Sequence, residues 1–293
     1  MSRLHLVGCA SGVAGADEHS GDGPLVIQQS EFLAALKNNH IDVHWEGMVI
    51  PEIKIQSQRL DQSIATLCTD LAGYTNKLTE QNKFFTVIGG DHSCAIGTWS
   101  GVQEAMKQEG DLGLIWIDAH MDSHTPETSP SGRIHGMPLA CLLGYGFETL
   151  TSILNESPKI KPQNLCLIGV RSYESGEAEL LKRLNVRIFY MEEVLSRGVH
   201  AVMQEAIEIV TQNTAAYGLT LDIDALDPVD APGVDVPEAN GIKAADIFRE
   251  YQNIISDKRL IATEIVEFDP TKDKNKKTEK IVVDLLKIIS QRN

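Results

Sequence analysis

The chain has 293 residues, of which 42% are hydrophobic and 23% are charged, and this composition is typical of a globular protein. Its net charge of −15 argues against nucleic acid or an anionic membrane as a partner, because both require a basic surface. The same charge is compatible with a cationic substrate.

The five cysteines are widely separated and include no Cys-x-x-Cys pair, so we interpret them as reduced thiols of a cytoplasmic protein. The first residues lead into a short strand-like run and lack the apolar core of a signal peptide. No stretch approaches the ~20 apolar residues that a transmembrane helix needs. We therefore expect a soluble, cytoplasmic protein without a membrane partner.

Short apolar runs alternate with longer segments of helical periodicity along the whole chain. The runs predict strands at 4–10, 43–50, 84–89, 113–118, 165–170, 186–190, 217–222 and 260–266. The longer segments predict helices at 57–81, 97–108, 175–184, 199–211, 244–255 and 280–291. This alternation indicates an α/β fold with a mostly parallel sheet and helices on both faces. No linker divides the chain, which favours one domain over residues 1–293, and we interpret the charged run 271–280 as a solvated lead-in to the last helix.

The predicted strand at 113–118 runs straight into the sequence Asp118-Ala-His120-Met-Asp122. Side chains two positions apart on a strand point to one face, so these three are expected to project together from its carboxyl end. Open α/β sheets form their sites at that end. One imidazole among carboxylates suits a first-row divalent metal such as Mn²⁺ better than Mg²⁺ or Ca²⁺. The alternative is a solvated loop whose charges alternate by chance.

Two other predicted strands also end in acidic residues or histidine. After 84–89, the glycines of Gly89-Gly-Asp-His92 permit a tight turn that leaves His92 at the sheet edge, although a single histidine there is more often structural. At the end of 217–222, Asp222 and Asp224 share one face, and like charges held so closely are costly unless a cation lies between them. This Asp-x-Asp pair therefore indicates a metal site.

The predicted strand at 260–266 is followed by Glu267, whose carboxylate could face the same pocket, with Glu264 and Asp269 as alternatives that spacing does not exclude. The candidate metal ligands are too many for one small cation with an open position. They suit two cations with bridging carboxylates, roughly 3.5–4 Å apart, which would produce hydroxide near neutral pH and support hydrolysis. The six ligands are His92, Asp118, His120, Asp122, Asp222 and Asp224.

Taken together, four motifs resemble the signatures of the ureohydrolases, the family that contains arginase, agmatinase and formiminoglutamase. They are Gly89-Gly-Asp-His92-Ser, Asp118-Ala-His120-Met-Asp122, Ser131-Gly-Arg-Ile-His135-Gly-Met-Pro138 and Asp222-Ile-Asp224-Ala-Leu-Asp-Pro228. The resemblance covers nearly the whole chain, and the motif that contains His135 is most similar to arginases. It implies a three-layer α/β/α fold on a parallel eight-stranded sheet, assembled as a homotrimer or homohexamer.

The resemblance also implies a binuclear Mn²⁺ centre, although Co²⁺, Ni²⁺ or Fe²⁺ would fit the same ligands. One cation would be held by His92, Asp118, Asp122 and Asp222, and the other by Asp118, His120, Asp222 and Asp224. In the family, a hydroxide between the metals attacks the guanidinium carbon, and Asp122 also hydrogen-bonds this hydroxide. His135 would shuttle protons, a role suited to a group that titrates near pH 7, and Glu267 would pair with the guanidinium. The products would be urea and an amine, which is L-ornithine when the substrate is L-arginine.

The substrate-binding positions depart from the arginase pattern. His124 and Arg133 stand where arginases have asparagines that hold the substrate carboxylate, while Ser131 is retained. Glu174 replaces an aspartate that meets the α-ammonium, and Asp235-Val236-Pro237 stands where a Gly-Thr-Pro is usual. Arg133 could bind a carboxylate through two hydrogen bonds. Alternatively, these are neutral substitutions.

The sequence thus predicts a manganese hydrolase that cleaves L-arginine or a close guanidino amino acid. Agmatine, a guanidino acid or formiminoglutamate are alternative substrates. A one-zinc deacetylase of related fold is disfavoured, because His92 and Asp224 complete a second metal site. A catalytically silent metal-binding protein is disfavoured because it would not need His135 and Glu267.

Overall fold

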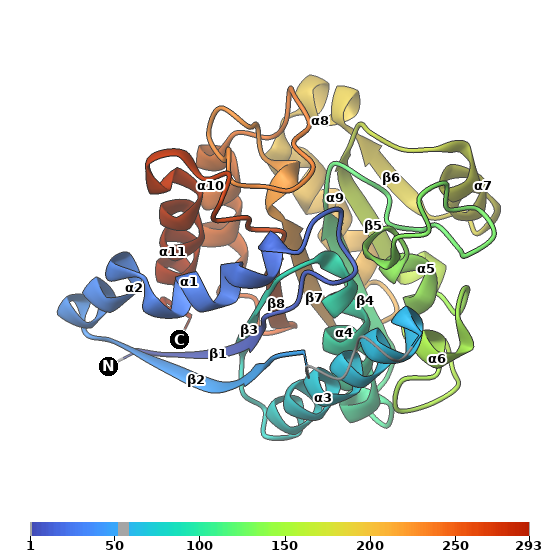
Figure 1. The fold of residues 1–293 in the computed structure, drawn as a ribbon, viewed down its shortest axis with the longest axis horizontal. Helices are drawn as coiled ribbons and strands as arrows, with labels where there is room; N and C mark the ends of the chain where they lie inside the picture. Colours follow the sequence, from blue (N-terminus) through green and yellow to red (C-terminus); the bar gives the residue numbers. More distant parts are fainter. Residues whose placement is uncertain (1, 52–58, 293) are drawn as a thin grey trace.

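The computed structural model describes residues 2–51 and 59–292 and contains an eight-stranded sheet in the order β2-β1-β3-β8-β7-β4-β5-β6 (Figure 1). Every pair of neighbouring strands is parallel. The strands are β1 (Ser2–Cys9), β2 (Ile41–Val49), β3 (Phe85–Gly89), β4 (Leu112–Ile117), β5 (Leu165–Val170), β6 (Arg187–Tyr190), β7 (Ala216–Asp222) and β8 (Leu260–Val266). The predicted parallel α/β fold is therefore confirmed, and each predicted strand is found with its ends shifted by no more than a few residues.

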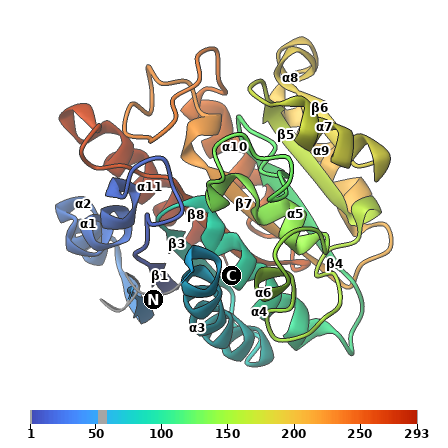
Figure 2. The same cartoon turned by 45° about the vertical axis from the view of Figure 1, so that its right-hand side comes forward.

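Helices cover both faces of this sheet, as the two views in Figures 1 and 2 show. One face packs against α1 (Gly23–Gln29), α2 (Glu31–Ala35), α8 (Met191–Arg197), α9 (Val199–Thr211), α10 (Ala244–Ile254) and α11 (Lys277–Ile289). The other packs against α3 (Leu60–Glu80), α4 (Ala95–Met106), α5 (Pro138–Leu142), α6 (Glu148–Thr151) and α7 (Ser175–Arg183). Among the described residues, none of these helices combines the length and apolar character required to cross a membrane.

The two apolar layers follow from alternation along the buried strands. In β4, Leu114 and Trp116 pack into one layer while Ile115 and Ile117 pack into the other. Strands buried on both faces are mostly apolar on both, which is why they appear in the sequence as nearly continuous apolar runs.

The predicted helices are all present, but several short ones were missed. The predicted start of the helix at 57–81 lies partly outside the described residues, and α3 begins at Leu60. The last helix begins at Lys277, three residues earlier than predicted, directly after a left-handed backbone at Asn275 and Lys276. Helices α1, α2, α5, α6 and α8 have between four and seven residues, too short to show a clear helical period.

The strand order brings the chemically important strand ends together. Strands β3, β8, β7 and β4 are neighbours in the middle of the sheet, although they are far apart in the sequence. Because all strands are parallel, their carboxyl ends lie at one edge. The polar residues that follow these four strands therefore meet there.

Close packing at the centre of the sheet gives a first prediction. A Cβ atom at Gly218, on β7, would overlap the ring of Trp99, which is fully buried. We expect Gly218→Ala to reduce the free energy of unfolding by about 1–3 kcal/mol, because the overpacked ring must move. Chemical denaturation measures this change.

Gly73→Ala is the matched control. Gly73 is exposed on α3, and a Cβ there meets nothing within 4 Å. The same substitution should stabilise the protein by about 0.5–1 kcal/mol at this position, because alanine has the better helix propensity. Equal effects at the two glycines would contradict the packing described here.

Candidate metal centre

The six predicted metal ligands all lie at the carboxyl edge of β3, β4 and β7. His92 begins the 3-10 turn His92–Cys94 after β3, and Asp118 directly follows β4. Asp222 is the last residue of β7, and Asp224 lies in the turn that follows. The loop after Asp118 carries the remaining two ligands, His120 and Asp122.

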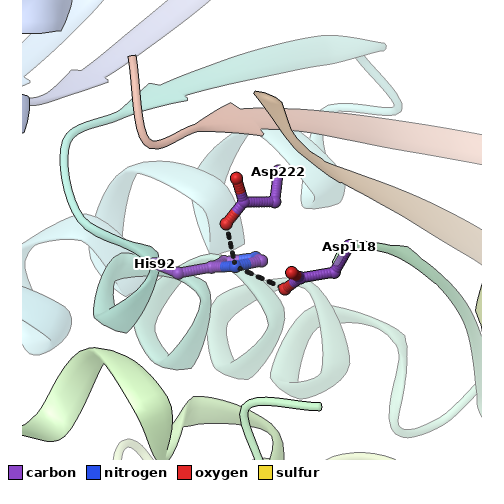
Figure 3. A group of neighbouring side chains, drawn as sticks. All are labelled: His92, Asp118 and Asp222. Carbon is purple, nitrogen blue, oxygen red and sulfur yellow. Dashed lines mark ion pairs between the residues drawn. The ribbon is translucent and has the colours of Figure 1, made fainter. Parts of the chain in front are cut away.

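The first group of ligands surrounds the His92 ring. Its Nδ1 atom lies 3.2 Å from Asp118 Oδ2, 3.1 Å from Asp122 Oδ2 and 3.1 Å from Asp222 Oδ2. Figure 3 shows the Asp118 and Asp222 carboxylates converging on the imidazole. Nδ1 is buried and has no hydrogen-bond partner among the residues that the structure describes. An orphaned ring nitrogen facing three carboxylate oxygens is the donor set of a divalent cation, so the residues fit a metal.

The second group shares Asp118 with the first. His120 Nδ1 lies 3.0 Å from Asp224 Oδ2 and 3.5 Å from Asp118 Oδ1, while the other Asp118 oxygen faces His92. Asp222, which the resemblance assigned to both cations, uses its Oδ1 to accept the Asp224 N–H at 2.8 Å, and only its Oδ2 faces the first group. Two adjacent groups bridged by one carboxylate can hold two cations side by side.

The carboxylates are under mutual repulsion because they are buried together. Burial, with Asp224 and Asp118 nearby, raises the pKa of Asp222 well above its ordinary value. Burial and Asp118 raise the pKa of Asp122 to about 6. Burial alone would lower the pKa of His92, but its three carboxylate neighbours raise it well above the usual range. Bound cations would relieve this repulsion.

Behind His92, a second layer of polar side chains fixes the orientation of the ring. His92 Nε2 lies 3.2 Å from Thr220 Oγ1, whose hydroxyl donates to Glu264 Oε2 at 2.7 Å. Glu264 is fully buried and also accepts from Thr98 and Trp99. With the Thr220 hydroxyl directed to Glu264, its oxygen accepts the Nε2 proton and leaves Nδ1 free for a metal. Nothing in the spacing of the sequence predicted this role for Glu264.

Above the ligands lies a cavity of about 280 Å³. Besides four of the metal ligands, it is lined by all the other residues that the sequence assigned to catalysis or substrate binding, namely His124, Ser131, Arg133, His135, Glu174 and Glu267. The sequence did not single out Ser129, Ser172 or Glu177, which also line it. A larger cavity of about 540 Å³ is lined by residues at the opposite ends of the strands, such as Arg3 and Lys83, and contains none of these ligands.

Among the three carboxylates that the sequence left open, only Glu267 lines this cavity. Its Oε1 atom accepts the His92 N–H at 2.8 Å and lies 3.3 Å from His135 Nδ1. Its Oε2 atom is buried and has no hydrogen-bond partner. Burial would lower the pKa of His135, but the hydrogen bond to Glu267 raises it to about 9. The pair thus offers a free carboxylate oxygen and a proton-carrying imidazole to a ligand.

Two of these residues have unusual backbone geometry. Asp122 has φ +48° and Glu267 has φ +63°, in the left-handed region that costs non-glycine residues energy. Both are tied down by backbone hydrogen bonds, from Leu139 N to Asp122 O and from Glu267 N to Gly90 O. Such strain is typical of residues held in place for a function.

The rim of the cavity carries the residues that depart from the arginase pattern. His124 Nε2 lies 3.0 Å from Glu174 Oε2, and its Nδ1 lies 3.2 Å from Thr128 Oγ1. Glu174 begins α7 in a capping box with Glu177, and its side chain is 61% exposed. Burial raises the pKa of Glu177 to about 8. Arg133 is exposed and lines the same cavity.

Comparisons with known proteins agree with this site. The family model described as the Arginase family matches residues 5–289. An arginase from Brevibacillus brevis is 37% identical over 278 residues, covering 93% of this chain and 92% of the relative. An arginase from Bacillus caldovelox is 37% identical over 275 residues, covering 90% of each.

The solved structures that resemble the chain include the crystal structure of arginase from Bacillus cereus. It superposes with a TM-score of 0.90 at 33% identity and covers 100% of this chain and 99% of its own. The chain belongs to the arginase family, whose members are hydrolases that act on the carbon–nitrogen bonds of guanidino groups.

Proposed function

We propose that this protein is a binuclear manganese arginase that hydrolyses L-arginine to L-ornithine and urea. The observation that carries the proposal is the pair of ligand groups bridged by Asp118 at the floor of a cavity that also contains His135 and Glu267. The relatives that match over nearly the whole chain are named arginases.

The metal sites fit two Mn²⁺ ions, since each group combines one imidazole with carboxylate oxygens. His92, Asp118, Asp122 and Asp222 would hold one ion, and His120, Asp118 and Asp224 the other. Bound there, the ions would supply a water that is deprotonated near neutral pH and can attack a carbon centre.

The side chains in the cavity above the proposed metal sites would bind the substrate and transfer protons. The free Oε2 atom of Glu267 is an acceptor in a buried place, and a guanidinium N–H would satisfy it and orient the substrate. His135 would protonate the nitrogen that leaves, because its pKa of about 9 keeps the proton on the ring at neutral pH. The substrate carboxylate would meet Arg133 at the rim, and its ammonium would meet Glu174.

The test is a panel of guanidino compounds. Protein stripped with a chelator should release no urea, and reloading with Mn²⁺ should restore release from L-arginine, with two ions bound per chain by metal analysis. Agmatine, guanidino acids and formiminoglutamate form the comparison set. Absence of urea or ammonia from every compound would refute the proposal, and one ion per chain would favour a mononuclear amide hydrolase.

The role of His135 gives a second test. His135→Asn should retain both metal ions while kcat falls by roughly 10²-fold or more, because the proton donor is lost but no metal ligand is changed. His19→Asn is the control, since His19 is exposed on the surface. Unchanged turnover in His135→Asn would remove this residue from the mechanism.

The rim gives a third test. Arg133→Ala should raise KM for L-arginine by about 10-fold or more, because a hydrogen-bonded charge pair contributes about 1.5–3 kcal/mol. Agmatine has no carboxylate, so its KM should change little. Parallel kinetics with both substrates measure the difference, and equal losses for both would show that Arg133 does not bind the carboxylate.

A further inference from the structure

Lys272 connects three loops that lie at the carboxyl edge of the sheet. Its Nζ atom lies 2.8 Å from Asp17 Oδ2, 2.7 Å from Asp235 Oδ1 and 3.2 Å from Asp269 Oδ2. Asp17 follows β1, Asp235 follows β7, and Asp269 follows β8. From the sequence alone, we interpret the charged run 271–280 as a solvated lead-in to the last helix. Lys272 does not fit this interpretation, because its ammonium pairs with three aspartates.

The carboxylates around this ammonium are held tightly. The side chains of Asp235 and Asp269 are 3% and 0% exposed, while those of Lys272 and Asp17 are 37% and 36% exposed. Burial would lower the pKa of Lys272, yet its hydrogen bonds to the three aspartates raise it above the ordinary value. Without the ammonium, the two buried carboxylates of Asp235 and Asp269 would lose the basic side chain that pairs with both of them, which is strongly destabilising for buried charges.

Asp235 extends the connection into the backbone of the first loop. Its Oδ2 atom accepts the N–H groups of Ala16, at 3.0 Å, and Asp17, at 3.2 Å. Two residues earlier, Ala14 O accepts the His135 N–H at 3.2 Å. Asp235 is therefore connected through hydrogen bonds of the first loop to the backbone of His135.

Asp269 makes the corresponding connection to Glu267. Its N–H donates to Gly233 O at 2.9 Å, and the neighbouring residues Val234 and Phe268 form an antiparallel bridge. The β8 loop, which begins at Glu267, is thereby joined to the β7 loop, which places Val236 in the cavity wall.

We propose that Lys272 is a positioning residue: its ammonium holds the loops after β1, β7 and β8 together as one wall of the cavity. It acts through these loops on His135 and Glu267 and touches neither the substrate nor the metal ligands. The inference rests on the proposed function, which assigns His135 and Glu267 their roles toward a guanidino substrate.

The test compares Lys272→Met with Lys274→Met. Both substitutions remove one positive charge from the same run, but Lys274 is exposed and has no place in the contacts above. Amide hydrogen exchange should accelerate by about 10-fold or more at Ala16, Asp17 and His135 in Lys272→Met, because the acceptors of their N–H groups are no longer held in place. Lys274→Met should leave these rates unchanged.

Kinetics then separate positioning from stability alone. Well below the unfolding temperature of each variant, Lys272→Met should lower kcat/KM by about 10-fold or more with both metal ions retained, since small displacements of catalytic groups are costly. Faster exchange with unchanged kcat/KM would overturn the proposal, as would unchanged exchange.

If Lys272→Met does not fold, Asp17→Asn replaces it in the test, and we expect smaller changes of the same sign in the exchange rates and in kcat/KM. If the parent protein cleaves no guanidino compound, the proposed function fails, while the exchange rate at His135 still decides whether Lys272 positions that residue.

Discussion

The mutual repulsion of buried carboxylates at one edge of a parallel sheet is the constraint on which this structure depends. Asp118, Asp122, Asp222 and Asp224 are all buried within a few ångströms of two imidazoles, and Asp118 faces both. Such a cluster is unfavourable in a folded protein unless cations balance it. The largely apolar strands, packed on both faces, supply the stability that offsets the cost of this cluster. The apolar layers on both faces of the sheet stabilise the fold, while the candidate metal ligands lie at its carboxyl edge.

Buried carboxylates are balanced in two other ways near the same edge. Glu264 accepts hydrogen bonds from four neutral donors, which belong to Cys94, Thr98, Trp99 and Thr220. In the cluster around Lys272, by contrast, an ammonium from the chain itself balances the carboxylates. This part of the sheet therefore combines three ways of balancing buried carboxylates: a candidate metal centre, neutral hydrogen bonds and an internal ion pair.

The sequence was sufficient to predict the strands and the gathering of the candidate metal ligands at one edge of the sheet, because both depend on local spacing. An apolar run that ends in Asp118, or in Asp222, places that carboxylate at a strand end whatever the rest of the chain does. Residue spacing did not predict which carboxylate after β8 faces the cavity. Glu267 has a left-handed φ and lines the cavity, and strand alternation alone does not distinguish it from Glu264 or Asp269. Residue spacing also did not predict the ion pairs of Lys272, because its contact with Asp17 joins residues 255 positions apart. For Glu177 the sequence contains a weak signal: an acidic residue three positions after the N-cap residue Glu174 is typical of a capping box.

The positions at which the resemblance marked departures from the arginase pattern line the cavity above the candidate metal ligands. A ligand at the floor must satisfy a cation, a hydrogen-bond partner behind it and close packing at once, so few residue types fit. His124 and Glu174 contact each other and the side chains of Thr128 and Glu177, and neither belongs to the predicted metal ligands. Their hydrogen bond uses one Glu174 oxygen, which leaves the second oxygen of this exposed carboxylate available for an ammonium. Arg133 adds a fixed positive charge where a neutral amide would offer only a dipole. The upper part of the cavity thus presents a guanidinium and an exposed carboxylate, which are complementary to the two charges that the proposed amino-acid substrate would carry.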